Sequence, residues 1–335
     1  MAALYVTSPQ AGAGKTAVCA GLGRHLQGDG RRVGFFKLIV SEIKSPEAID
    51  SDAQFMKHIL ALKEPINSLC PVIGRDGNLT SKIKQAYAKV SRGKDVVIVE
   101  GVWRQRPGGK PIEASRQVVE ALDARVIIVE PYSEELSKAM SIDNYKDFGE
   151  NLLGVVVNKV PRSRVEHLYN QLSGVDILGV LPEDRVLISL TVGELAEHIG
   201  GEILNCAEKS SELVEDFMLG AMTVDSGLDY FGRKANKAVV VRGERPDMQL
   251  AALETSTKCL VVSGVPPIHT VLRRAEDRGI PIILTKGDTV STVNSIELAL
   301  GKTRFNQEKK LSRLGEIMEQ QFNFQALYRG LGLAG

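Results

Sequence analysis

Short apolar runs alternate with longer amphipathic stretches along the first half of the chain. The runs are rich in Val and Ile, and several end in a polar or charged residue. Near-continuous apolar strands are typical of a parallel sheet whose two faces are both covered by helices. The pattern therefore predicts an α/β fold, with strands at residues 3–6, 33–39, 94–101, 125–131, 152–159 and 176–182.

The same alternation begins again in the second half of the chain. Apolar runs at residues 238–241, 259–262 and 280–284 predict three further strands, and residues 246–256 and 266–279 between them are interpreted as helices. A second, smaller α/β domain is therefore expected.

The stretch 205–231 has mixed helical spacing and is interpreted as a bridge between the two domains. We place the domains at residues 1–205 and 206–335. An amphipathic helical tail is predicted at 308–328, and its apolar face lies either on its own domain or on a partner subunit.

The first strand runs into a glycine-containing loop, residues 7–16, which reads Thr-Ser-Pro-Gln-Ala-Gly-Ala-Gly-Lys-Thr. Apolar residues after it recur at helical spacing, so the loop opens a helix whose free N–H groups and positive dipole end face an anion. Lys15 can then reach terminal phosphates, and the Thr16 hydroxyl can ligate Mg²⁺. We assign nucleotide contacts to Gly12, Ala13, Gly14, Lys15, Thr16 and Ala17.

This loop departs from the P-loop pattern G-x-x-x-x-G-K-[ST], because Pro9 stands where the pattern needs glycine. A second Gly-Lys-Thr occurs at residues 301–303. It follows a helical run with no strand before it, so Gly301 is interpreted as a helix-stopping glycine. The order strand, loop, helix favours the first copy as the phosphate site.

Two carboxylates are candidates for completing a magnesium site with Thr16. Glu100 ends a buried strand, at the edge where open α/β sheets bind ligands. The alternative interpretation of Glu100 is a solvent-exposed residue at the end of a strand. Asp52 lies near the start of a predicted helix, where an acidic residue also favours the helix dipole.

Lys37 is a cation at the end of the strand next to the loop strand. It could hold a transferring phosphoryl group or an acidic substrate, which would give it a catalytic role together with Lys15. The alternative is a lysine whose stem is buried and whose ammonium reaches solvent. Asn158 ends another strand, where nucleotide proteins often contact the base, and Pro161 replaces the aspartate of a guanine signature. Adenine is therefore preferred.

Composition excludes several partners. Lys and Arg number 42 and Asp and Glu 41, and no basic run with interleaved aromatics occurs, so nucleic acid is not expected. No long apolar stretch or leader pattern is present, so we expect a cytoplasmic protein without a membrane segment. The four cysteines are far apart in the sequence and form no zinc or disulfide pattern.

The loop residues, Phe36-Lys37 with Ser41, Ser51-Asp52-Ala53, Glu100-Gly101 and Val157-Asn158 together resemble dethiobiotin synthetase and its P-loop relatives. The resemblance covers roughly residues 1–205. It implies that Lys15 and Thr16 hold ATP and magnesium, that Asp52 and Glu100 complete the metal site, and that Lys37 helps to bind a carbamate.

The chain departs from that family at substrate positions. The family's Lys-Pro is Lys37-Leu38 here, its Glu-Gly-Ala-Gly-Gly continues as Val102-Trp103-Arg104 after Gly101, and a loop threonine used on substrate is Ala11. The nucleotide residues are thus kept while the substrate residues are altered.

The second half resembles the DRTGG domain. Residues 242–250 and 262–265 match its two segments, with Glu244 for Asp, Ser263 for Thr and Val265 for the last Gly. A synthetase-like domain followed by this module is the arrangement at the N-terminus of long phosphotransacetylases, where it is regarded as regulatory. The sequence ends at Gly335, so phosphate acetyltransferase activity is not expected.

Three functional hypotheses follow. The first is an ATP- and Mg²⁺-responsive regulatory protein in acyl-phosphate or related metabolism. The second is an ATP-dependent ligase that activates a carboxylate or carbamate by phosphoryl transfer for attack by an amine. The third is a scaffold that has lost nucleotide binding. A nucleotide, an acidic small molecule, a second copy of the chain and a separately encoded metabolic enzyme are the expected partners.

Overall fold

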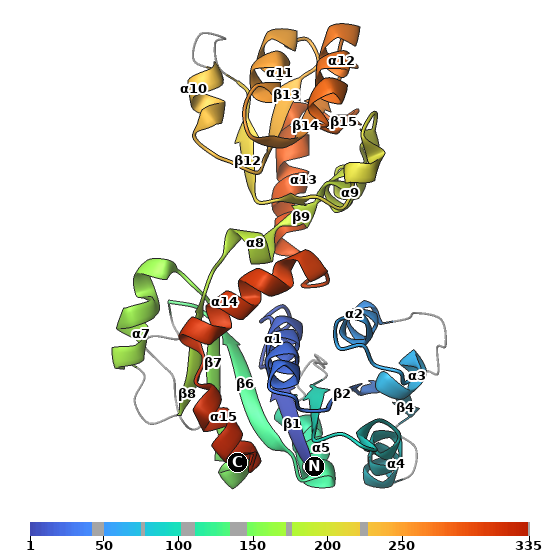
Figure 1. The fold of residues 1–335 in the computed structure, drawn as a ribbon, viewed down its shortest axis with the longest axis vertical. Helices are drawn as coiled ribbons and strands as arrows, with labels where there is room; N and C mark the ends of the chain where they lie inside the picture. Colours follow the sequence, from blue (N-terminus) through green and yellow to red (C-terminus); the bar gives the residue numbers. More distant parts are fainter. Residues whose placement is uncertain are drawn as a thin grey trace. The chain divides into compact units, whose positions relative to one another are not determined.

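A computed structural model describes residues 1–41, 50–74, 78–101, 111–134, 146–171, 176–221 and 227–333. The chain divides into two compact units (Figure 1). Unit 1 comprises Met1–Glu183 and Phe305–Gly335, and unit 2 comprises Asp184–Arg304. Within the described ranges, every helix is too short or too polar to cross a bilayer.

Unit 1 is built on a six-stranded sheet in the order β2-β5-β1-β6-β7-β8, and every neighbouring pair is parallel. The Val- and Ile-rich strands are buried because helices cover the sheet, which confirms the predicted fold class. Strands β2 and β5 lie on one side of β1, and β6, β7 and β8 lie on the other side. The order in which strands are added therefore changes direction at β1. The strands are β1 (Ala2–Thr7), β2 (Val33–Lys37), β5 (Val96–Glu100), β6 (Arg125–Pro131), β7 (Leu152–Val160) and β8 (Ile177–Pro182).

Helices and short segments complete this unit. A separate parallel ladder pairs β3 (Ile39–Ser41) with β4 (Val72–Gly74), so the predicted strand 33–39 in fact ends at Lys37. The helices are α1 (Lys15–Gly28), α2 (Ser51–Ile59), α3 (Ile66–Leu69), α4 (Leu79–Ser91), α5 (Pro111–Leu122), α7 (Val165–Gln171), α14 (Leu311–Gln321) and α15 (Phe324–Leu331), with 3-10 turns η2 (Lys146–Asn151), η3 (Arg162–Arg164) and η6 (Glu308–Lys310).

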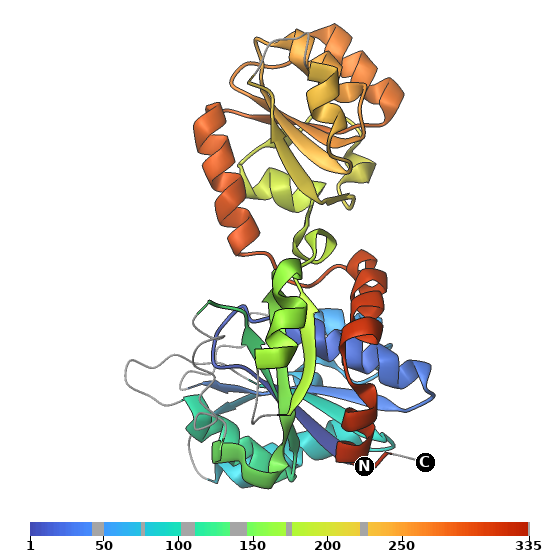
Figure 2. The same cartoon turned by 90° about the vertical axis from the view of Figure 1, so that its left-hand side faces the viewer.

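The C-terminal helices pack on unit 1, along the same side of its sheet as α1 (Figures 1 and 2). The His25 ring of α1 stacks on Phe324 at 3.4 Å between centroids. The Asn323 N–H donates to the Leu178 carbonyl at 2.7 Å, and a Cβ on Gly179 would lie 3.2 Å from the Phe322 ring. The tail is therefore held by contacts with α1 and β8, a placement that the periodicity left open.

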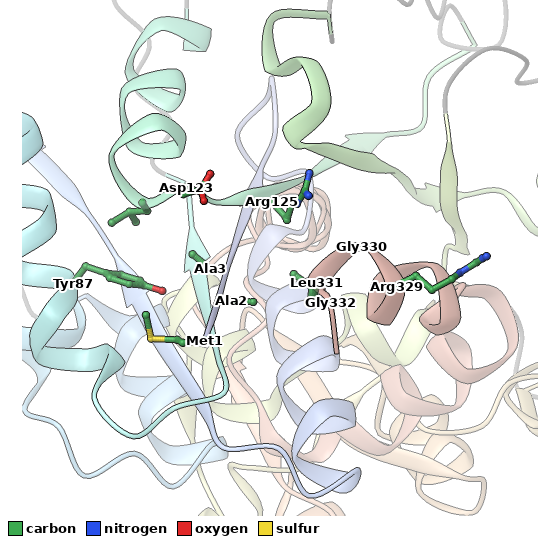
Figure 3. Close-up of a pocket in the computed structure, with 11 residues that line it drawn as sticks. Met1, Ala2, Ala3, Tyr87, Asp123, Arg125, Arg329, Gly330, Leu331 and Gly332 are labelled. Carbon is green, nitrogen blue, oxygen red and sulfur yellow. The ribbon is translucent and has the colours of Figure 1, made fainter. Parts of the chain in front are cut away.

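The start and end of the described chain meet at the amino edge of this sheet. Residues 1–3 and 329–332 line a hollow of about 360 Å³ together with Tyr87, Asp123 and Arg125 (Figure 3).

Unit 2 has a five-stranded sheet in the order β10-β15-β14-β13-β12, in which β10 is antiparallel and the others are parallel. Buried apolar residues form one core on each face, under α10, α11 and α12 on one side and under α9 and α13 on the other. The strands of this sheet are β10 (Glu202–Ile203), β12 (Asp216–Leu219), β13 (Lys237–Arg242), β14 (Thr257–Ser263) and β15 (Ile282–Thr285).

The remaining elements of unit 2 are short or helical. A two-stranded ladder joins β9 (Leu190–Thr191) and β11 (Leu213–Val214), and η4 (Ala207–Lys209) is a 3-10 turn. The helices are α8 (Arg185–Ile188), α9 (Val192–His198), α10 (Gly227–Gly232), α11 (Pro246–Leu253), α12 (His269–Arg278) and α13 (Thr289–Gly301).

The two units differ from the predicted domain ranges 1–205 and 206–335. Residues 184–205 belong to unit 2, where α9 packs on its sheet, and residues 305–335 return to unit 1. The stretch 205–231 is not only a bridge, because Phe217 and Met218 lie in β12 and pair with β13. Helical spacing in this stretch was misleading, since pairing with a distant strand decided its structure.

Candidate nucleotide site

The phosphate loop, residues 8–14, connects the end of β1 to the start of α1. Gly12 and Gly14 have φ values of +73° and +95°, a left-handed conformation that glycine adopts without a Cβ clash. The Ser8 hydroxyl donates to the Gln10 carbonyl at 2.9 Å and accepts from the Gln10 N–H at 3.1 Å, which orders the start of the loop. Among the described residues no side chain caps the N-terminus of α1, so its first N–H groups are available to an anion.

Two side chains at the carboxyl end of β7 bond to this loop. The Asn158 carboxamide donates to the Ala13 carbonyl at 2.8 Å, and the Lys159 ammonium donates to the Gly12 carbonyl at 2.9 Å. A Cβ on Gly14 would lie 2.2 Å from Asn158 Nδ2, so a larger residue at position 14 would displace the Asn158 carboxamide from its hydrogen bond with the loop. Asn158 thus contacts the loop itself, and its predicted contact with a base stays a prediction.

Lys15 begins α1 and turns back over the loop, with its Nζ 3.5 Å from the Gln10 carbonyl. Burial lowers the pKa of Lys15, and the nearby Glu100 carboxylate opposes that change. The ammonium group is therefore held close to the loop backbone and on the same side as the carboxylates.

Three carboxylates and two polar side chains converge at the carboxyl ends of β2 and β5. Lys37 Nζ lies 2.6 Å from Asp52 Oδ2, 3.1 Å from Asp50 and 3.4 Å from Glu100 Oε1. The Thr16 hydroxyl donates to Glu100 Oε1 at 3.1 Å. The parallel register Lys37↔Glu100 places these two residues side by side on neighbouring strands.

Glu100 is the most buried of the three carboxylates, with 3% of the residue exposed. Burial raises the pKa of Glu100 to about 6, while the Lys37 ammonium and the Thr16 hydroxyl act in the opposite direction. Its Oε2 atom is buried and has no hydrogen-bond partner among the described residues. Glu100 therefore has one carboxylate oxygen that could still accept a hydrogen bond or bind a cation.

Gly101, the residue after Glu100, allows the end of β5 to lie close to β1. Its N–H donates to the Val6 carbonyl at 2.8 Å, and a Cβ here would lie 2.9 Å from the Tyr5 hydroxyl. A larger residue would push β5 away from β1.

The donor set fits a hard cation such as Mg²⁺. Carboxylate and hydroxyl oxygens are its preferred protein ligands, and Glu100 offers one oxygen, Oε2, without a hydrogen-bond partner among the described residues, while its Oε1 accepts from the Thr16 hydroxyl. No group of three or more His, Cys, Asp or Glu side chains with metal-binding geometry occurs in the described part of the chain. Magnesium usually takes one or two carboxylates and completes its shell with water and phosphate oxygens, so the set is sufficient.

The structure brings together Lys15, Thr16, Lys37, Asp52 and Glu100, and the roles expected of them stay predictions. Lys37 is paired with carboxylates and its side chain is only 12% exposed, so it is not a lysine reaching into solvent.

One contributor was missed by the sequence reasoning: Asp50, whose carboxylate bonds to Lys37 and also accepts from the Ala53 N–H at 2.8 Å as the N-cap of α2. The available signal was an aspartate at the start of the stretch with helical spacing, residues 50–62, because N-caps favour aspartate. The altered substrate segment Val102-Trp103-Arg104 lies outside the described residues, as does the side chain of Ser41.

All four cysteines are free thiols, and three of them are buried.

Two family matches cover most of the chain. Residues 2–191 match the family described as AAA domain, and residues 194–299 match the DRTGG domain. The second match confirms the resemblance drawn from residues 242–250 and 262–265.

The curated relatives combine the two expected resemblances. Phosphate acetyltransferase of Nitrosomonas europaea is 25% identical over 97% of this chain and 50% of its own length. The ATP-dependent dethiobiotin synthetase of Caldicellulosiruptor saccharolyticus is 27% identical over 47% of this chain and 74% of its own. The chain thus spans about half the length of the phosphate acetyltransferase that it matches.

Among solved structures, the CBS and DRTGG domains of the regulatory region of Clostridium perfringens pyrophosphatase, complexed with the activator diadenosine tetraphosphate, align with 35% of this chain and 51% of that one. The identity is 18% and the TM-score 0.31, a likeness too low to bear on function.

Proposed function

Since the chain belongs to the family described as AAA domain, which matches more than half of it, we propose that it is an ATP- and Mg²⁺-binding regulatory protein. Its nucleotide site is the phosphate loop of unit 1. Unit 2, which matches the DRTGG domain, gives or receives the signal in acyl-phosphate or related metabolism.

The observation that carries the proposal is the uncapped start of α1 beside Lys15, Thr16 and Glu100. Left-handed glycines turn the loop backbone, and the free N–H groups of α1 supply donors for phosphate oxygens. Lys15 lies at the same point and neutralises the phosphate charge. Such an arrangement has no purely structural use, because uncapped helix ends otherwise cost stability.

In this proposal Thr16 and Glu100 hold the magnesium ion, with Asp52 as the second carboxylate. The ion supplies charge neutralisation to the phosphates when it is bound. The Oε2 atom of Glu100, which has no hydrogen-bond partner among the described residues, would bind the ion, and the Thr16 hydroxyl donates to the other carboxylate oxygen. Asn158 and Lys159 keep the loop carbonyls turned away from the anion by bonding to them.

Regulation is favoured over ligation because the residues that differ from dethiobiotin synthetase are those of the substrate side, such as Ala11 in the exposed part of the loop. The phosphate acetyltransferase of Nitrosomonas europaea matches 97% of this chain, whereas the synthetase matches 47% of it. An ATP-dependent carboxylate or carbamate ligase remains the second candidate, since Lys15 and Lys37 could stabilise a transferring phosphoryl group.

Thermal unfolding with Mg-ATP, Mg-GTP or neither tests the proposal. A ligand at 100 times its Kd stabilises the fold by about 2.7 kcal/mol, so Mg-ATP should raise the melting temperature of the wild type and not that of Lys15→Ala. Lys302→Ala is the matched control, because it alters the lysine of the second Gly-Lys-Thr. The absence of any nucleotide effect on the wild type contradicts both candidates, and a preference for GTP contradicts the assignment of adenine.

Phosphate release separates the two candidates. The regulatory hypothesis expects a nucleotide-dependent shift without phosphate release across a panel of amines and carboxylates. Release that depends on one of these acceptors would instead support the ligase. Under either candidate function, a second copy of the chain and a separately encoded metabolic enzyme are the protein partners that we propose.

A further inference from the structure

We infer that Lys37 is a built-in counter-cation that competes with Mg²⁺ for Asp52 and Glu100, and that Asp50 receives its ammonium group when the metal binds. The inference rests on the proposed metal site and specifies how that site is regulated. It starts from one observation: the Lys37 ammonium is paired with the same two carboxylates that the metal would need, 2.6 Å from Asp52 Oδ2 and 3.4 Å from Glu100 Oε1.

The two cations exclude each other from this position. Mg²⁺ binds oxygen at about 2.0–2.1 Å, and Lys37 Nζ is already 2.6 Å from Asp52 Oδ2, so an ion held by Asp52 and by the Glu100 carboxylate would lie against the Lys37 ammonium. Like charges at such separations repel strongly where little water screens them, and the side chains of Lys37 and Glu100 are only 12% and 4% exposed. The ammonium must therefore leave before the metal enters.

Asp50 is placed to keep the displaced ammonium paired. Its carboxylate is 3.1 Å from Lys37 Nζ, and its Oδ1 also accepts from the Ala53 N–H at 2.8 Å as the N-cap of α2. Because the helix end fixes this carboxylate, Asp50 does not need to move when the metal takes the others. An ammonium without such a partner would be a buried, uncompensated charge, which is strongly unfavourable.

The arrangement makes metal binding depend on the nucleotide. In the nucleotide-free protein Lys37 already balances the carboxylates, so Mg²⁺ gains little by replacing it. A bound triphosphate adds oxygen ligands for the metal and negative charge near Lys37, and both changes favour the exchange. Lys37 therefore prevents the site from filling with metal before nucleotide arrives.

Titration of the nucleotide-free, full-length chain with Mn²⁺, followed by electron paramagnetic resonance, tests this inference. Lys37→Met should bind Mn²⁺ at least about tenfold more tightly than the wild type, because the competing charge is gone. Lys94→Met is the matched control, since it removes a lysine of similar side-chain exposure, 17%, that pairs with Glu64 at 3.1 Å. Equal or weaker Mn²⁺ binding by Lys37→Met overturns the inference. Lys37→Gln repeats the test with a side chain that still donates a hydrogen bond, should the methionine variant not fold.

A double-mutant cycle tests the part played by Asp50. Asp50→Asn keeps a good N-cap but removes the charged partner that Lys37 would retain once the metal takes Asp52 and Glu100, so it should weaken Mn²⁺ binding severalfold in the wild-type background. In the Lys37→Met background the same change should have a clearly smaller effect. An equal loss of Mn²⁺ affinity in both backgrounds would mean that Asp50 acts only through its own charge. It would contradict the inference that the Lys37 ammonium moves to Asp50.

These measurements need no nucleotide. A wild type that ignores Mg-ATP, while Lys37→Met gains affinity for Mn²⁺, would contradict the proposed function and leave this inference standing.

Discussion

At the scale of single residues, burial lowers stability where a polar group lacks a hydrogen-bond partner or a charged group lacks an ion-pair partner. Among the described residues, the Tyr87 hydroxyl has no hydrogen-bond partner, and the buried Lys237 ammonium bonds only to the Thr255 hydroxyl and the Ser256 carbonyl, each at 3.0 Å. Glu100 shares this property but lies in the candidate site, where a bound cation would satisfy it. We assign no ligand to the Tyr87 hydroxyl or the Lys237 ammonium, so mutation of either residue should change stability alone.

Tyr87→Phe should leave the free energy of unfolding unchanged or raise it by up to about 1 kcal/mol. The substitution removes a buried hydroxyl that has lost its water without gaining a partner, and it keeps the ring that packs edge-on against Phe36. Tyr5→Phe is the contrasting variant, because the Tyr5 hydroxyl donates to Ser115 at 3.0 Å. It should lower the free energy of unfolding by about 1 kcal/mol. Urea titration measures both, and a clear loss in Tyr87→Phe would show that its hydroxyl is satisfied.

Lys237→Met should be more stable than the wild type at pH 7, by roughly 1–3 kcal/mol. Burial lowers the pKa of Lys237 from 10.5 to about 8, so charging this lysine in the folded state is unfavourable. Between these two pH values the unfolded chain binds more protons than the folded one, and the wild type should gain stability as pH rises.

Urea titrations at pH 7, 8 and 10 test this pH dependence. The difference between Lys237→Met and the wild type should shrink as pH rises, and a constant difference would contradict the prediction.

At the scale of elements, the two Gly-Lys-Thr segments show that neighbours give a tripeptide its structure. Gly14 follows the loop after β1, has a left-handed φ of +95° and touches Asn158. Gly301 is the last residue of α13, it has no left-handed φ, and a Cβ there would meet nothing within 4 Å. Thus α13 does end at this glycine, but the left-handed conformation of a glycine C-cap is not used there.

The same substitution should therefore have opposite effects at the two glycines. Gly14→Ala should destabilise unit 1 by about 1–3 kcal/mol and abolish the nucleotide effect on melting, because it forces a strained conformation and a clash at 2.2 Å. Gly301→Ala should be neutral or stabilise α13 by up to about 1 kcal/mol, since alanine is the better helix former. Thermal unfolding of both variants decides the matter, and equal losses would mean that Gly301 is also conformationally restricted.

At the scale of the whole molecule, the chain forms two units with separate cores, and the C-terminal helices belong to the first. Unit 1 is therefore discontinuous in sequence, and unit 2 is an insertion between β8 and α14. Separate cores allow each unit to unfold on its own.

Hydrogen exchange should reveal this division. Mg-ATP should slow exchange at the most protected amides of β1, α1 and β5. It should do the same for α14 and α15, which are far away in sequence, because all of these elements unfold together with the nucleotide site. The core strands β13 and β14 should exchange at unchanged rates. Protection that appears in unit 2 but not in α14 and α15 would contradict the assignment of the tail to unit 1.

The sequence by itself determined the local features of this protein. The Val- and Ile-rich runs, the glycines of the loop and the position of Glu100 at a strand end were sufficient for the α/β fold and the candidate nucleotide site, because they depend on neighbours a few residues away. The tertiary structure alone decided the long-range pairings: the return of α14 to α1, the strand at residues 216–219, and the contact of Asp50 with Lys37. Periodicity cannot supply these, because which surfaces meet depends on packing between segments that lie far apart in the chain.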